Sequence, residues 1–245
     1  MSCEACLNGS DLAFQFTMAF QPIVHLETRT IYSYEALVRG PAGEGAGWVL
    51  GRVDDANRYQ FDQSCRVRAI ELAARLGVAT HLNINFLPNA VYRPETCIRA
   101  TVEASDRFSF PVERLIFEVT ESEPMQEPGH VRNIFQEYRN RGILTAIDDF
   151  GAGFSGLNLL ADFQPDMLKL DMALVRNVHE QKARTAIIAG VVATCRSLDI
   201  LLVAEGVETK EELTRLRDLG IEYFQGYLFA KPEFEGLPEP QYVGF

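Results

Sequence analysis

The sequence predicts an α/β fold, a modified (β/α)8 TIM-like barrel in which one strand is antiparallel to the others. Eight strand-like runs occur in 245 residues, and helical patterns alternate with them from residue 60 onward. Alternating strands and crossover helices imply parallel pairing, and the length suits an eight-stranded barrel. Only residues 26–30 separate the first two strands, and a parallel crossover needs about a dozen residues, so these two strands should form a hairpin.

The predicted strands are short runs of branched and aromatic residues that end at polar residues, glycine or proline. They cover residues 19–24, 31–38, 81–86, 115–119, 144–147, 167–170, 201–204 and 223–225. The spacing of apolar residues predicts helices over residues 62–76, 129–140, 181–198 and 211–219. The last helix follows a capping box, in which Thr209 and Glu212 stand three residues apart.

The chain shows no sign of a division into several domains. No proline- or serine-rich linker interrupts it, and its length is sufficient for one large core. We therefore expect a single barrel domain over residues 16–245, preceded by a flexible segment of residues 1–15. A doubly wound open sheet is the alternative fold, but no glycine-rich phosphate loop follows an early strand. Cys3 and Cys6 form a CxxC pair without a second pair nearby, which favours a flexible terminus over a zinc knuckle.

The composition limits the partners and the location of the protein. The net charge is -11, from 23 basic and 34 acidic side chains, which argues against binding of duplex nucleic acid through basic residues alone. A phosphate ligand would therefore need help from metal ions. The longest apolar stretches are too short to cross a bilayer, and no secretory leader is recognisable. We expect a cytoplasmic protein with reduced cysteines and no membrane insertion.

Polar residues stand at or near the carboxyl ends of seven predicted strands. In a barrel these ends meet at one face, where active sites lie. Any single one of them could be a core polar group satisfied by hydrogen bonds, but a set from seven strands favours a functional site. The residues are Glu35, Asn83, Asn85, Glu118, Glu121, Asp148, Asp149, Lys169, Asp171, Glu205 and Gln225.

The acidic side chains of this set predict a metal site. They would repel one another at low dielectric unless their pKa values rise or cations neutralise them. Oxygen ligands without cysteine or histidine favour Mg²⁺ or Mn²⁺ over zinc or copper. The adjacent Asp148 and Asp149 suit a pair of ions, and two-metal sites commonly hydrolyse phosphoesters. Lys169 could position the attacking water, or could form a simple ion pair with Asp171 or Asp148.

Several of these residues belong to short motifs that occur in a fixed order. Glu35, Ala36 and Leu37 are part of a Glu-x-Leu-x-Arg sequence. It is followed by Phe117-Glu118-Val119-Thr120-Glu121, Asp148-Asp149-Phe150-Gly151, Lys169-Leu170-Asp171, Ala204-Glu205-Gly206-Val207-Glu208 and Gln225-Gly226-Tyr227. This series resembles the EAL-domain family of bacterial cyclic di-GMP phosphodiesterases, and the resemblance covers nearly the whole chain, residues 21–232.

The resemblance implies a barrel with one antiparallel strand and a role for each matching residue. Two Mg²⁺ or Mn²⁺ ions are implied, the first held by Glu35, Asn83, Glu118 and Asp148, and the second by Asp148, Asp149 and Glu205. The implied catalytic residues are Lys169, which holds the nucleophilic water, Glu205, and Gln225, which supports the waters at the metals. The implied substrate contacts are Gln21 to guanine, Leu37, Arg39 to phosphate, and Asp171. Glu121 resembles a glutamate that anchors the loop after residue 149 and links the metal site to a homodimer surface.

The activity implied by the resemblance is hydrolysis of cyclic di-GMP to linear 5′-pGpG, which lowers a bacterial second messenger. Two alternatives remain: a catalytically idle cyclic di-GMP sensor or protein-interaction module, and a barrel enzyme for a sugar phosphate, which only the fold supports. No sensory domain is recognisable, so we expect regulation through the dimer surface, a regulatory protein partner or expression. The chain departs from the family pattern at Ala152, Phe154, Gly156 and Asn85, and in the short segment 40–61.

Overall fold

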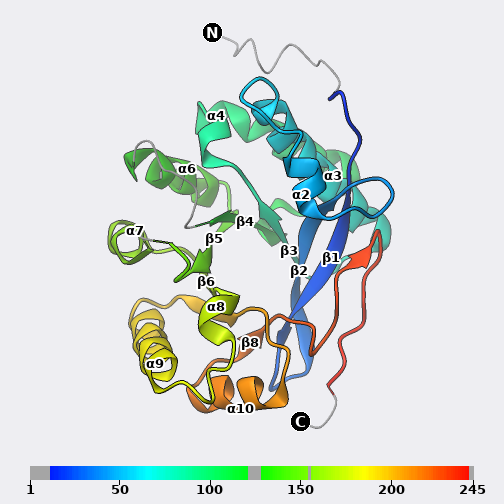
Figure 1. The fold of residues 1–245 in the computed structure, drawn as a ribbon. Coiled ribbons are helices and arrows are strands. Elements are labelled where there is room, and N and C mark those ends of the chain that lie inside the picture. The colour runs from blue at the N-terminus through cyan, green and yellow to red at the C-terminus, as the bar shows by residue number, and fades with distance from the viewer. Residues whose placement is uncertain (1–11, 121–127, 154–155, 243–245) are drawn as a thin grey trace.

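The computed structural model describes residues 12–120, 128–153 and 156–242, and Figure 1 shows their fold. Eight strands close into a barrel with the neighbour order β2-β3-β4-β5-β6-β7-β8-β1, and β1 pairs again with β2. The predicted barrel is therefore confirmed. Its strands are β1 (Thr17–His25), β2 (Thr30–Arg39), β3 (His81–Asn85), β4 (Leu115–Thr120), β5 (Leu144–Phe150), β6 (Met167–Leu170), β7 (Leu201–Ala204) and β8 (Tyr223–Phe224).

Strand β1 is the antiparallel strand that the short connection predicts. It pairs antiparallel with both β2 and β8, whereas the successive pairs from β2 to β8 are parallel. In the hairpin Thr17 lies opposite Arg39, and Gln21 lies opposite Glu35. An additional strand, β9 (Glu233–Phe234), also pairs antiparallel with β1. Strand β9 was not predicted, because a two-residue strand has no recognisable alternation.

Helices between the strands cover the outside of the barrel (Figure 1). The four predicted helices correspond to α3 (Arg58–Leu76), α6 (Pro128–Asn140), α9 (Lys182–Ser197) and α10 (Lys210–Asp218). The capping box of α10 is present, with the Glu212 amide donating to Thr209 Oγ1 at 3.2 Å. The remaining helices were not predicted, mostly because they are too short to show a helical repeat. The helices are α2 (Ala46–Leu50), α3 (Arg58–Leu76), α4 (Pro94–Cys97), α5 (Arg99–Phe108), α6 (Pro128–Asn140), α7 (Gly156–Asp162), α8 (Met172–Val175), α9 (Lys182–Ser197) and α10 (Lys210–Asp218), with 3-10 turns η1 (Pro88–Ala90) and η2 (Val112–Arg114).

Apolar side chains fill the barrel interior near the amino ends of the parallel strands. The rings of Tyr32 and Tyr223 meet edge to face at 5.1 Å and pack against this interior cluster. Because this end of the barrel is filled, the polar residues farther along the strands are approached from the carboxyl ends, as in other barrels. The members of the cluster are Ile23, Ile116, Ala146, Met167 and Val203.

Two further expectations concern a membrane span and the division of the chain into domains. Among the described residues, no helix combines the length and the hydropathy that crossing a bilayer requires. The division into a segment of residues 1–15 and a domain of residues 16–245 remains a prediction, and Cys3 and Cys6 lie outside the described residues.

Candidate metal-dependent active site

The side-chain period of the strands places the functional residues one layer beyond the apolar cluster. Glu118, Asp148, Lys169 and Glu205 each follow a cluster residue by two positions, on β4, β5, β6 and at the end of β7. Residues two apart on a strand point to the same face, so these four side chains enter the barrel interior. Strand β1 runs in the opposite direction, so its polar residue comes before its cluster residue: Gln21 precedes Ile23 by two positions.

Lys169 lies at the centre of this layer, and its side chain is fully buried. Its Nζ atom forms four ion pairs, three of them with residues on β2, β4 and β5 and one with the residue directly after β7. The partners are Glu35 Oε2 at 3.3 Å, Glu118 Oε2 at 3.0 Å, Asp148 Oδ1 at 3.1 Å and Glu205 Oε1 at 2.7 Å. Of the two simple ion pairs considered for this lysine, the one with Asp148 is thus present as part of a larger cluster.

Side-chain amides hold the carboxylates in place. Asn83 donates to Glu118 Oε1 at 2.5 Å, and Asn85 donates to Glu35 Oε1 at 2.9 Å. Gln225 donates to the other oxygen of Glu35 at 2.8 Å. The role of Asn85 was missed, although its spacing of two residues from Asn83 places both on one face of β3. Each carboxylate oxygen that an amide fixes loses freedom to rotate, which favours a defined ligand geometry.

Strand β5 brings two consecutive acids to the site through a local irregularity. Consecutive residues of a regular strand point to opposite faces. The pairing of β5 with β6 shifts register between Ile147 and Phe150, and Asp149 has a φ of 55°. A non-glycine residue in the left-handed region is uncommon, although aspartate tolerates it better than most. This conformation places Asp149 beside Asp148 rather than on the helix side of the sheet.

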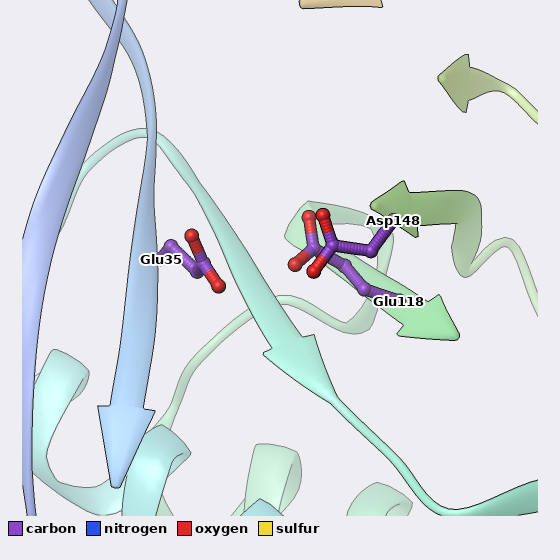
Figure 2. A group of neighbouring side chains, drawn as sticks. All are labelled: Glu35, Glu118 and Asp148. Atoms are coloured by element: carbon purple, nitrogen blue, oxygen red, sulfur yellow. The ribbon is translucent and has the colours of Figure 1, made fainter. Parts of the chain in front are cut away.

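The acids form two groups that are suited to cations. Glu35, Glu118 and Asp148 form the first group, which Figure 2 shows, and Asp148 also belongs to a second group with Asp149 and Glu205. Within each group, one oxygen per residue lies within 4.8 Å of the others.

The donor atoms also fit hard divalent cations. Asn83 Oδ1 is buried and has no hydrogen-bond partner in the described part of the chain, so an oxygen ligand remains available beside the first group. Carboxylate and amide oxygens are the ligands that Mg²⁺ and Mn²⁺ prefer.

Burial and repulsion by neighbouring acids raise the pKa values of Glu118, Asp149 and Glu205. Burial raises the pKa of Glu118 to about 8, against the attraction of Lys169, and Glu35 and Asp148 add to the rise. Burial, Asp148 and Asp171 raise the pKa of Asp149 to about 6. Burial and Asp148 also raise the pKa of Glu205 well above its usual value. The metal-free cluster therefore holds protons near neutral pH that a bound cation would displace.

We expect the metal-free protein to lose stability as pH rises. The pKa of Glu118 is raised from 4.5 to about 8, so its contribution is fully present below about pH 4.5 and disappears as pH rises through about 8. At 1.4 kcal/mol per pKa unit, the free energy of unfolding should fall by about 2.5 kcal/mol between pH 6 and pH 8.5. Urea denaturation in EDTA measures this change. Saturating Mg²⁺ should reverse the trend, and a metal-free protein that is more stable at pH 8.5 would contradict the assignment.

A comparison with known protein families covers almost the whole chain. A family model described as EAL domain matches residues 10–232. The chain belongs to the EAL domain family. The blue light- and temperature-regulated antirepressor BluF of Escherichia coli (strain K12) is 35% identical over 221 residues, which are 90% of this chain and 55% of BluF. The probable cyclic di-GMP phosphodiesterase PdeG of the same strain is 31% identical over 240 residues, 94% of this chain and 46% of PdeG. The chain thus spans about half the length of these curated relatives.

Solved structures of EAL proteins share the fold. The c-di-GMP bound form of a standalone versatile EAL protein from Vibrio cholerae O395 is 52% identical with a TM-score of 0.92, and the match covers 94% of this chain and 98% of that chain. The manganese/cy-diGMP complex of Klebsiella pneumoniae BlrP1 at pH 6 is 36% identical with a TM-score of 0.87, over 93% of this chain and 60% of that chain. Another BlrP1 complex contains calcium with the same ligand. The two BlrP1 complexes therefore combine a divalent metal with cyclic di-GMP.

Two of the predicted substrate contacts, Gln21 and Asp171, lie beside the acidic cluster of the EAL domain. Gln21 accepts from Gln225 at 3.3 Å and donates to the Ala230 carbonyl at 3.0 Å. Asp171 caps α8 by accepting from the Ala173 amide at 2.8 Å, and its charge acts on Asp149. The structure thus connects Gln21 and Asp171 to the site.

The remaining predicted contacts have weaker or undescribed connections. Leu37 lines a cavity beside the carboxyl ends of β2 and β3. Arg39 bonds to the Val38 carbonyl at 2.8 Å, so its predicted phosphate contact stays a prediction. Glu121, the predicted loop anchor, lies outside the described residues, as does Phe154 of the loop after Asp149.

Proposed function

We propose that this EAL domain is a metal-dependent phosphodiesterase that hydrolyses cyclic di-GMP to linear 5′-pGpG. The observation that carries the proposal is the pair of acidic groups that share Asp148 and surround the buried Lys169. Support comes from the 52% identical EAL protein that was solved with c-di-GMP. Hydrolysis of a bacterial second messenger would place the protein in the cytoplasm.

Each residue of the site would have a separate role in the proposed reaction. Two divalent ions, Mg²⁺ or Mn²⁺, would supply positive charge for the phosphate and acidify a water. Glu35, Asn83, Glu118 and Asp148 would hold one of them, and Asp148, Asp149 and Glu205 the other. Lys169 would orient the attacking water and stabilise negative charge on the phosphate oxygens. Gln225 and Asn85 keep the Glu35 carboxylate in position.

The substrate contacts are proposed for the rim of the same site. Gln21 would bind a guanine edge, Arg39 a phosphate and Leu37 an apolar face of the substrate, while Asp171 would add a polar contact. Water oxygen then forms a bond to phosphorus, the bond from phosphorus to the ribose 3′ oxygen breaks, and a proton goes to that oxygen. The products are a 5′ phosphate and a free 3′ hydroxyl, so the ring opens to a linear dinucleotide.

Chromatography of the nucleotides tests the proposal. Purified protein is incubated with cyclic di-GMP and either Mg²⁺, Mn²⁺ or EDTA. Linear 5′-pGpG in the metal-containing reactions alone supports the enzyme. Intact cyclic di-GMP in every reaction would overturn it.

A second candidate function rests on the relative BluF, whose name describes an antirepressor. A chain of this kind would bind cyclic di-GMP or a regulatory protein without useful turnover. The full set of acids in this chain favours the enzyme, because a module that only binds has no need for two acidic groups around a lysine. Equilibrium dialysis separates the two: tight binding of intact cyclic di-GMP in the presence of Mg²⁺ would favour the sensor.

We also propose that the protein forms a homodimer through the face next to β5. A groove of about 700 Å³ on this face is lined by Phe150, Leu157, Leu174 and Ile187, among others. Leu157 is 71% exposed and Ile187 is 52% exposed, which is unusual for large apolar side chains that lie together. Replacement of Leu157 by aspartate should shift the mass measured by light scattering from a dimer toward a monomer. A monomeric wild-type protein would contradict the proposal.

A further inference from the structure

A buried ion pair lies behind the strands that carry the first acidic group. Asp62 and Arg66 of α3 are 2% and 0% exposed, and Arg66 Nη2 lies 2.6 Å from Asp62 Oδ2. Arg66 also donates to the Tyr138 hydroxyl at 2.9 Å, and its guanidinium lies 4.9 Å from the ring centre of Phe117. These residues take no direct part in the proposed reaction.

Stability alone gives little reason for this pair. Removing two charges from water is costly, and apolar replacements of such pairs are often neutral or stabilising. In addition, Arg66 Nε is buried without a hydrogen-bond partner among the described residues. Burial of the Asp62–Arg66 pair therefore has an unfavourable desolvation free energy.

The second oxygen of Asp62 holds the chain where it leaves β3. Asp62 Oδ1 accepts from the Leu87 amide at 2.9 Å. Leu87 is two residues beyond Asn85, which donates to Glu35, and the intervening Phe86 amide donates to the Glu118 carbonyl at 3.0 Å. The hydrogen bond from the Leu87 amide to Asp62 therefore holds the segment of residues 85–87. This segment contacts Glu35 through Asn85 and Glu118 through Phe86.

Apolar packing is incomplete at the same corner. A cavity of about 290 Å³ lies between α3 and the ends of β2 and β3, and its lining includes Leu37, Asp62, Asn85 and Leu87. Close packing normally fixes the position of a strand end. Where a cavity interrupts that packing, a directional hydrogen bond can take over this task.

We propose that Asp62 is a positioning residue for the first acidic group. Arg66 supplies the counter-charge that orients the Asp62 carboxylate toward the Leu87 amide. The proposal rests on the proposed metal-dependent function. Outer residues that orient metal ligands typically contribute about 10- to 100-fold to metal affinity. We therefore expect a loss of about tenfold in Mn²⁺ affinity when the acceptor for the Leu87 amide is removed.

Two double variants isolate this acceptor. Both carry Arg66→Met, so that no unpaired charge is left in the interior. Asp62→Asn/Arg66→Met keeps an oxygen acceptor for Leu87, whereas Asp62→Leu/Arg66→Met does not. We expect titration calorimetry to give the first variant a Mn²⁺ dissociation constant within about threefold of wild type and the second one about tenfold weaker. Thermal unfolding in EDTA should show both variants folded, which separates positioning from stability.

Other results would overturn the proposal. Equal Mn²⁺ affinity in the two variants, or weaker affinity in the asparagine variant, would leave the pair with a structural role only. If the leucine does not fit, Asp62→Ala/Arg66→Met takes its place with the same expected loss. Wild-type protein that binds Mn²⁺ without hydrolysing cyclic di-GMP would defeat the proposed function but not this comparison, whereas wild-type protein that binds no Mn²⁺ would defeat both.

Discussion

Replacement of Lys169 by methionine should lower the free energy of unfolding of the metal-free protein by about 3–5 kcal/mol at pH 8.5. The Lys169 ammonium is fully buried and contacts four carboxylates. Methionine fills a similar space but leaves these acids without compensation in the interior. Saturating Mg²⁺ should recover most of the loss, because the cations replace the missing positive charge. Urea denaturation with EDTA or with Mg²⁺ measures both effects.

The same variant should lose about 10²- to 10³-fold in turnover even when loaded with metal, because loss of one group that stabilises developing charge has that effect in other enzymes. Lys182→Met is a matched control, since Lys182 is an exposed lysine at the start of α9. It should change neither stability nor turnover. A Lys169→Met enzyme that keeps turnover within tenfold of wild type would remove this lysine from the reaction.

Replacement of Glu35 by glutamine should reduce turnover on the order of 10³-fold and weaken metal binding. Metal ions contribute several kcal/mol of charge stabilisation in such reactions, and each 1.4 kcal/mol corresponds to about tenfold in rate. Glutamine keeps the shape of the side chain and an oxygen that can accept from Asn85. The loss should therefore come from the missing charge of the first acidic group. Initial rates with cyclic di-GMP and Mn²⁺ calorimetry measure the two effects.

The matched control for this substitution is Glu27→Gln in the turn between β1 and β2. Glu27 is exposed, and the turn lies at the end of the barrel away from the acids. This control should behave as wild type in both measurements. A Glu35→Gln protein that retains full activity would show that the acidic cluster is not the reaction centre. That result would favour the sensor function over the enzyme.

The convergence of the acids was predictable because strand ends share one rim of a barrel. Glu118, Asp148 and Glu205 could each be assigned to a strand end from the sequence alone, and the structure brings them to one lysine. The hairpin was predictable for a similar reason, since a short connection excludes a parallel crossover. Periodicity and connection length are local properties, so a single sequence contains them.

Features that depend on the relative position of distant residues were not predictable. The bond from Asn85 to Glu35 depends on the register of β2 against β3, in which Glu35 lies opposite Asn83. The left-handed conformation of Asp149 depends on a register shift between β5 and β6. Strand β9 and the short helices lack a repeat of their own. Such features arise from tertiary packing, which overrides or extends local preference.

The reversal of β1 also decides where preceding chain would attach to this domain. In an all-parallel barrel the first strand enters at the end opposite to the active site. Here Thr17 lies opposite Arg39, the last residue of β2, so the polypeptide enters at the rim that carries the acidic side chains. From Thr17 to Gln21 is four residues, or about 13 Å of extended strand. In a longer protein of this family, a domain that precedes β1 would connect directly to the strand that carries Gln21. A displacement of that domain would then reach Gln21 without passing through the rest of the barrel.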